Sequence, residues 1–78
     1  MTQIVPVPRL GELTESIVVT RWLCAVGDVL AEGQPIAEVE TDKVETEVVS
    51  PVAGRVVGLL AEEGDELDVG AGLVEVER

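Results

Sequence analysis

An internal repeat with an offset of 37 residues constrains this sequence more than any other feature. When residues 17–40 are aligned with residues 54–77, nine of the 24 positions are identical. The identical glycines and aspartates are turn residues, whereas the identical aliphatic residues are typical of strands. Each half of the chain is therefore predicted to form a similar strand–turn–strand unit.

Strand-forming residues dominate both halves. The chain has 16 valines, three isoleucines and five threonines, and no segment shows a sustained helical spacing of apolar residues. Strands are predicted at residues 3–7, 17–23, 29–30, 36–40, 44–49, 54–60, around residue 67, and at 73–77. Since neither unit can bury its apolar face alone, the two should pack face to face. We expect an all-β flattened barrel or sandwich with pseudo-two-fold symmetry.

Length and charge exclude several classes of function. With 78 residues the chain forms at most one small domain. Its net charge of −11, without a basic patch, argues against nucleic acid and membrane partners. The chain has no histidine and one cysteine, Cys24, which leaves no metal site of the usual type and no internal disulfide. Cys24 and Trp22 are predicted to be packing residues. The absence of a signal-peptide pattern predicts a cytoplasmic protein, or a matrix protein if the source is eukaryotic.

Lys43 is the only lysine in the sequence, and it lies in the short connection between the two halves. The repeat predicts a hairpin there with Asp42-Lys43 at its tip, at the end of the domain opposite the termini. Considered alone, a lysine at a turn is usually just a solvated residue. In a symmetric scaffold, however, a unique amine on a rigid turn indicates a group that is presented to other proteins.

Several separated segments of the chain together resemble the lipoyl domains of 2-oxo acid dehydrogenase acyltransferase components. They are Glu40-Thr41-Asp42-Lys43-Val44, Gly27-Asp28, Ser50-Pro51-Val52-Ala53-Gly54, Glu63-Gly64-Asp65 and Leu10-Gly11-Glu12. The resemblance implies a sandwich of two antiparallel four-stranded sheets. It also implies that residues 1–78 form one lipoyl domain. We expect this to be the N-terminal domain of a longer acyltransferase, with a free-standing carrier as the alternative.

The resemblance further implies roles for individual residues. Lys43 would carry lipoic acid in amide linkage. The lipoylating enzyme, a lipoate ligase or lipoyl transferase, would recognise a set of residues comprising Glu40, Asp42, Val44, Gly27 and Gly54. The candidates for docking to a partner are Gly11, Glu12 and Glu15. Many relatives have a Glu-Gly pair where this chain reads Ser16-Ile17. We therefore expect this chain to differ from those relatives in the backbone of this loop or in its choice of partner.

In that family the domain is a carrier and has no catalytic activity of its own. Lipoate on Lys43 would be reductively acylated by a thiamin-diphosphate-dependent 2-oxo acid decarboxylase, would deliver the acyl group to coenzyme A at an acyltransferase core, and would be reoxidised by dihydrolipoyl dehydrogenase. The isolated domain is expected to be a monomer. Two alternatives stay open: a biotin carrier domain of a carboxylase and a docking module that is never modified. The biotin family flanks its lysine with methionines, whereas Lys43 lies between Asp42 and Val44.

Overall fold

The structure is a computed structural model, and it describes residues 1–9, 15–42 and 44–78. These residues form eight β-strands, and none of them is helical. The strands are β1 (Thr2–Pro6), β2 (Ser16–Trp22), β3 (Val29–Leu30), β4 (Pro35–Glu40), β5 (Glu45–Val49), β6 (Gly54–Leu59), β7 (Glu66–Asp68) and β8 (Gly72–Glu77). Each predicted strand agrees with an observed strand to within one residue at either end.

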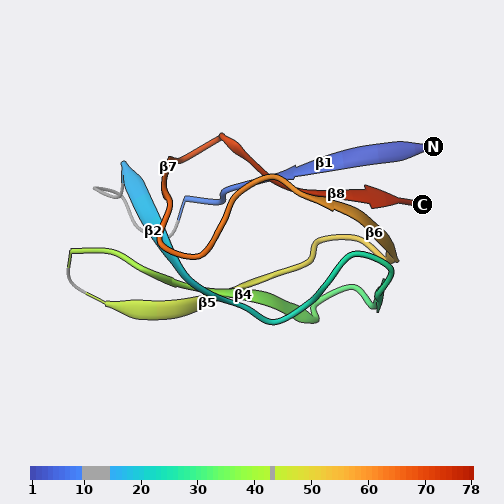
Figure 1. The fold of residues 1–78 in the computed structure, drawn as a ribbon, viewed down its shortest axis with the longest axis horizontal. Helices are drawn as coiled ribbons and strands as arrows, with labels where there is room; N and C mark the ends of the chain where they lie inside the picture. Colours follow the sequence, from blue (N-terminus) through green and yellow to red (C-terminus); the bar gives the residue numbers. More distant parts are fainter. Residues whose placement is uncertain (10–14, 43) are drawn as a thin grey trace.

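The strands form two antiparallel four-stranded sheets that pack as two layers (Figure 1). One sheet has the order β1-β8-β6-β3 and the other the order β5-β4-β2-β7. Under the predicted repeat, β6, β7 and β8 correspond to β2, β3 and β4, which lie 37 residues earlier, and β1 and β5 occupy equivalent edge positions outside the repeat. The all-β fold with pseudo-two-fold symmetry is thus confirmed. The sheets remain open at their edges, so the fold is a flattened sandwich and not a closed barrel.

The short strands β3 and β7 exchange between the two halves. β3 pairs with β6 from the second half, and β7 pairs with β2 from the first. The turns before these strands are held in the same way. The Gly27 N–H donates to the Val56 carbonyl oxygen (2.8 Å), and the Gly64 N–H donates to the Val19 carbonyl oxygen (2.6 Å). Both glycines have a positive φ, 98° for Gly27 and 94° for Gly64, a conformation that other residues rarely adopt.

The core lies between the sheets and draws side chains from both halves. Among the described residues, fifteen hydrophobic side chains form one buried cluster, and most of them are valines. The equivalent residues Val39 in β4 and Val76 in β8 are both fully buried. The alternation of buried and exposed residues along the strands therefore follows the pattern that predicted them.

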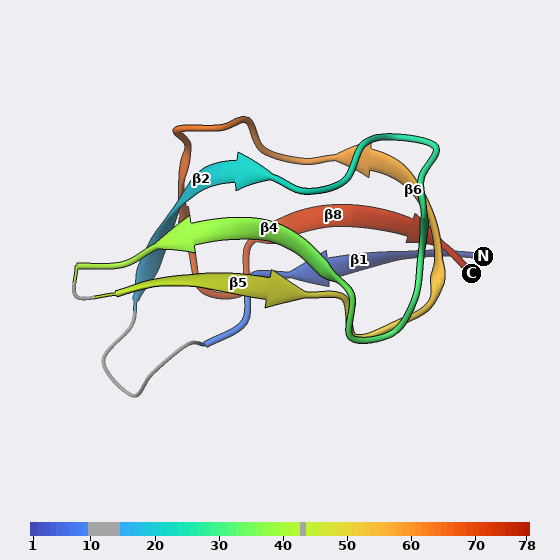
Figure 2. The ribbon, with the colours of Figure 1, turned by 90° about the horizontal axis from the view of Figure 1, so that it is seen from below.

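The β4–β5 hairpin and the two termini lie at opposite ends of the longest axis (Figure 2). The molecule extends 33 Å along that axis and 21 and 17 Å along the others. This arrangement confirms the predicted placement of the hairpin. In the described part of the chain, no helix is long and apolar enough to cross a membrane, and no group of acidic, histidine or cysteine side chains is arranged to hold a metal ion.

Gly54 is expected to be a residue that the fold cannot replace. A Cβ atom at this position would lie 2.6 Å from Val76 Cγ1 and would also clash with the Glu77 backbone. We predict that Gly54→Ala lowers the free energy of unfolding by about 1–3 kcal/mol, as measured by urea denaturation.

Gly58→Ala is the matched control in the same strand, because a Cβ there would meet no atom closer than 3.8 Å. That variant should stay within about 0.5 kcal/mol of the wild type or be slightly more stable. An equal loss of stability in both variants would contradict the packing argument.

Candidate functional site: the β4–β5 hairpin

The candidate site is the hairpin formed by β4 and β5. In its register Glu40 pairs with Glu45, Val39 with Thr46, and Glu38 with Glu47. Val39 is buried in the core and anchors the hairpin to the sandwich. The glutamates alternate with it, so they lie on the outer face of the sheet. The hairpin is therefore fixed from within by apolar packing and carries carboxylates outside.

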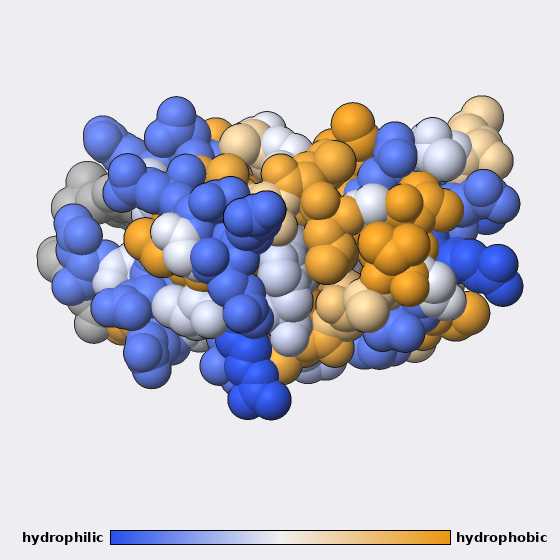
Figure 3. Space-filling model, viewed as in Figure 1, coloured by the Kyte–Doolittle hydropathy of each residue, from blue (hydrophilic) through white to orange (hydrophobic). Residues whose placement is uncertain are grey.

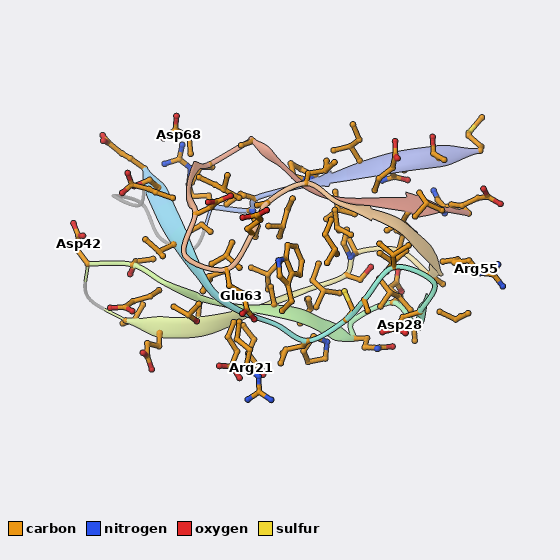
Figure 4. All side chains as sticks on the ribbon, viewed as in Figure 1. Arg21, Asp28, Asp42, Arg55, Glu63 and Asp68 are labelled. Carbon is orange, nitrogen blue, oxygen red and sulfur yellow. The ribbon has the colours of Figure 1, made fainter. Side chains whose placement is uncertain are left out.

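The end of the hairpin is closed by Thr41 and Val44. The Thr41 N–H donates to the Val44 carbonyl oxygen (2.8 Å). The Thr41 hydroxyl accepts the Val44 N–H (3.2 Å) and donates to the Val44 carbonyl oxygen (3.3 Å). Asp42 and Lys43 form the two-residue connection between these positions. Asp42 is exposed at the extremity of the molecule (Figure 4), whereas Lys43 lies outside the described residues.

Carboxylates dominate the surroundings of the hairpin end. Glu40 and Glu45 are exposed and lie directly opposite each other, and Glu38 and Glu47 form a second like-charged cross-strand pair. Such pairs are destabilising in a sheet. Figure 3 shows that hydrophilic side chains cover much of the half of the visible face that carries the hairpin, whereas apolar side chains gather farther from it. The hairpin end therefore presents a strongly negative surface.

One predicted docking residue lies on the same end of the domain. Glu15 is exposed, and its carbonyl oxygen accepts the Val69 N–H (3.0 Å). It immediately precedes β2, which pairs with the hairpin where Val18 lies opposite Glu40. Gly11 and Glu12, the other predicted docking residues, lie outside the described residues.

Gly27 and Gly54 are brought together by the fold, but far from the hairpin end. Their chain neighbours Asp28 and Arg55 lie at the other end of the molecule from Asp42 (Figure 4). Gly27 has a positive φ in a turn that bonds to β6, and Gly54 packs tightly against β8. Both glycines thus have structural roles. Their recognition by a modifying enzyme stays a prediction.

Trp22 and Cys24 are packing residues, as predicted. Trp22 is half-buried, its indole N–H donates to the Ala61 carbonyl oxygen (3.0 Å), and its backbone N–H donates to Glu63 Oε2 (3.0 Å). Cys24 is buried in the core cluster. Burial raises the pKa of its thiol, and the negative charge of Asp28 raises it further. The thiol therefore stays protonated at neutral pH and is a poor nucleophile.

Thr41 is the residue that sequence reasoning did not single out. The sequence does contain a signal for it, because threonine side chains often bond to backbone groups a few residues away in turns. Spacing alone does not reveal that the hydroxyl contacts both backbone groups of Val44.

The chain matches a family model over most of its length. The Biotin_lipoyl model, described as "Biotin-requiring enzyme", matches residues 3–76. The chain belongs to this biotinyl/lipoyl family. It is 49% identical over 92% of its length to the dihydrolipoyllysine-residue acetyltransferase component of the pyruvate dehydrogenase complex of Corynebacterium glutamicum. It is 44% identical over 99% of its length to the dihydrolipoyllysine-residue succinyltransferase component of the 2-oxoglutarate dehydrogenase complex of Bartonella vinsonii subsp. berkhoffii.

A solved structure agrees with these sequence relatives. The solution structure of the lipoyl domain of the 2-oxoglutarate dehydrogenase complex from Azotobacter vinelandii is 26% identical to this domain, with a TM-score of 0.74. The match covers 97% of this chain and 98% of that one. The chain spans only 11% and 19% of the two acyltransferase relatives. The resemblance to lipoyl domains of acyltransferase components is confirmed, and this family membership makes the domain a carrier and not a catalyst.

Proposed function

We propose that this domain carries lipoic acid in amide linkage to Lys43 and transfers acyl groups within a 2-oxo acid dehydrogenase complex. The observation that carries the proposal is the closed β4–β5 hairpin, whose two-residue connection contains the only lysine of the chain. The hairpin lies at the extremity of the domain, opposite the termini (Figure 2). An amine attached there can reach active sites on other proteins without displacing the scaffold.

The residues around the connection fit such a group. Asp42 is exposed and Val44 is 54% exposed, so the flanks of Lys43 are open to a modifying enzyme. When bound, lipoate supplies a redox-active disulfide that accepts an acyl group, yields it to coenzyme A and is reoxidised. The protein residues hold the attachment point: Thr41 and Val44 close the hairpin beneath it. The modifying enzyme would contact Glu40, Asp42 and Val44 directly.

Gly27 and Gly54 would assist modification indirectly. Because they lie at the opposite end of a molecule 33 Å long, an enzyme acting at Lys43 depends on them through the fold that they permit. Gly27 allows the turn before β3, and Gly54 allows β6 to approach β8 closely.

The proposed partners follow from this carrier role. They are a thiamin-diphosphate-dependent 2-oxo acid decarboxylase, an acyltransferase core, dihydrolipoyl dehydrogenase, and a lipoate ligase or lipoyl transferase. The domain would be the N-terminal part of a longer acyltransferase and would act in the cytoplasm, or in the matrix of a eukaryote. Tethering raises the effective concentration of the carrier at each active site, so weak docking is sufficient.

A biotin carrier is the second candidate function. The description of the matching family model favours it, since that description refers to biotin-requiring enzymes. The relatives named as lipoyl-bearing components and the Asp42-Lys43-Val44 sequence favour lipoate. The choice of cofactor therefore needs a direct test.

Lys43 is the residue that we predict to be modified. Incubated separately with a lipoate ligase and a biotin ligase, the purified domain should gain one lipoyl group at Lys43, as measured by intact mass and peptide mapping. Lys43→Arg should gain none, because it retains the charge but loses the acylatable amine. Its unfolding transition should match that of the wild type.

Three other results would each indicate a different function or a structural role for Lys43. Biotin attached in place of lipoate would move the domain to the carboxylase class. Failure of the folded wild type to accept either group would support the docking module. Loss of cooperative unfolding in Lys43→Arg would reveal a structural role for the lysine.

We infer that the decarboxylase has a basic surface, which docks on the negative hairpin end. The exposed carboxylates of Glu15, Glu40 and Asp42 lie there, the first two beside the paired ends of β2 and β4, and opposite charges steer and orient an encounter. Such an attraction is screened over about 10 Å at 0.1 M salt. Docking should therefore depend on ionic strength.

This docking surface can be tested by removing one carboxylate at each end of the domain. The kcat/KM of the decarboxylase for the lipoylated domain should fall with added salt, and Glu15→Gln should lower it by about two- to threefold at low salt. Glu32→Gln is the matched control, because Glu32 is exposed in the connection between β3 and β4, at the termini end of the domain. If the two variants lose activity equally, net charge and not a local surface governs docking.

The isolated domain is proposed to be a monomer. Its net charge of −11 opposes self-association; of the four edge strands, β3 and β7 are very short, and β1 and β5 carry Pro6 and Glu47. Sedimentation at micromolar concentrations should therefore give the mass of one chain. A dimer under these conditions would contradict the proposal.

A further inference from the structure

The Thr41 side chain makes an unusual closure at the base of the two-residue connection. In a common β-turn, the N–H of the fourth residue donates to the carbonyl oxygen of the first. Here the Val44 N–H donates to the Thr41 hydroxyl (3.2 Å), and the same hydroxyl lies 3.3 Å from the Val44 carbonyl oxygen, to which it donates. One side chain thus contacts both backbone polar groups of Val44.

The internal repeat supplies a comparison within the same molecule. Arg78 is equivalent to Thr41 under the offset of 37 residues, and its N–H donates to the Met1 carbonyl oxygen (2.9 Å), as the Thr41 N–H does to Val44 (2.8 Å). The backbone closure is therefore a property of the fold. At the equivalent position the arginine side chain donates to Gln3 Oε1 (3.1 Å), so the hydroxyl contacts are particular to the hairpin.

We propose that Thr41 is a positioning residue for the modification of Lys43, because its hydroxyl holds Val44 and so fixes both ends of the Asp42-Lys43 connection. This inference rests on the proposed function. A connection held at both ends presents its amine in fewer orientations, and an enzyme that transfers a group to that amine benefits from such restriction. Thr41 itself takes no part in the chemistry.

The test compares Thr41→Val with Thr41→Ser. Valine has nearly the shape of threonine but no hydroxyl, whereas serine keeps the hydroxyl. With a lipoate ligase, Thr41→Val should lower kcat/KM for attachment by about fivefold, the order expected for the loss of one side-chain hydrogen bond. Thr41→Ser should restore most of the rate. Hydrogen exchange of the Val44 amide should be faster in Thr41→Val by a similar factor and close to wild type in Thr41→Ser.

Thr20→Val is the matched control. Thr20 is exposed on β2, and its hydroxyl donates to the Glu38 carbonyl oxygen of β4 (3.0 Å). The same substitution there removes a similar hydrogen bond from the same sheet but leaves the hairpin end intact. Its attachment rate and Val44 exchange should match the wild type, whereas a general loss of sheet stability would affect both valine variants.

Several outcomes would overturn the proposal. It fails if Thr41→Val is modified as fast as Thr20→Val, or if Thr41→Ser is as slow as Thr41→Val. Free exchange of the Val44 amide in the wild type would also overturn it, and this measurement needs no variant to fold. A wild type that accepts no lipoyl group would refute the proposed function instead, while the exchange data would still decide whether the hydroxyl holds Val44.

Discussion

The exchange of β3 and β7 between the two halves is the interaction on which the rest of the structure depends. Each of these short strands leaves its own half and pairs with the other, and each is preceded by a glycine turn that donates a hydrogen bond across the same boundary. Neither half can therefore complete its sheet alone, and the buried cluster forms only when both are present. The two halves must fold as one unit, which stabilises a domain of 78 residues whose single cysteine allows no internal disulfide.

This stability allows the hairpin end to carry features that weaken it. Two consecutive like-charged pairs, Glu40 with Glu45 and Glu38 with Glu47, face the solvent on the hairpin. Such pairs cost stability, and in a marginal hairpin they would favour fraying. Here Val39 anchors β4 in the core and β2 pairs with it on the far side. The sandwich thus offsets the repulsion, and the negative surface can be used for recognition.

Much of the fold could be predicted because the repeat places turns and strands in fixed order. The identical Gly27 and Gly64 mark turns that require a positive φ, and the alternation of valines marks the strand faces. The sequence did not predict whether the two sheets close into a barrel or stay open as a sandwich, because closure depends on the angle between the sheets. The sequence also did not predict that Gly54 lies at the opposite end of the domain from Asp42, because the separation of two residues in sequence does not fix their positions in space. The Thr41 contacts depend on a rotamer, which no sequence pattern specifies.

The same acidic residues also protect a weak point of the architecture. An open sandwich leaves β1 and β5 unpaired along one side, and an apolar groove lies between them, lined by residues such as Val5, Pro6 and Val49. Unpaired edges beside apolar surface favour association with a further strand. Pro6 ends β1, Glu47 lines the groove, and Glu45 adds a second negative charge along β5. A strand of another copy, with its own net negative charge, would meet repulsion along β5. The charges that give the hairpin end its negative surface therefore also oppose aggregation through the open edge.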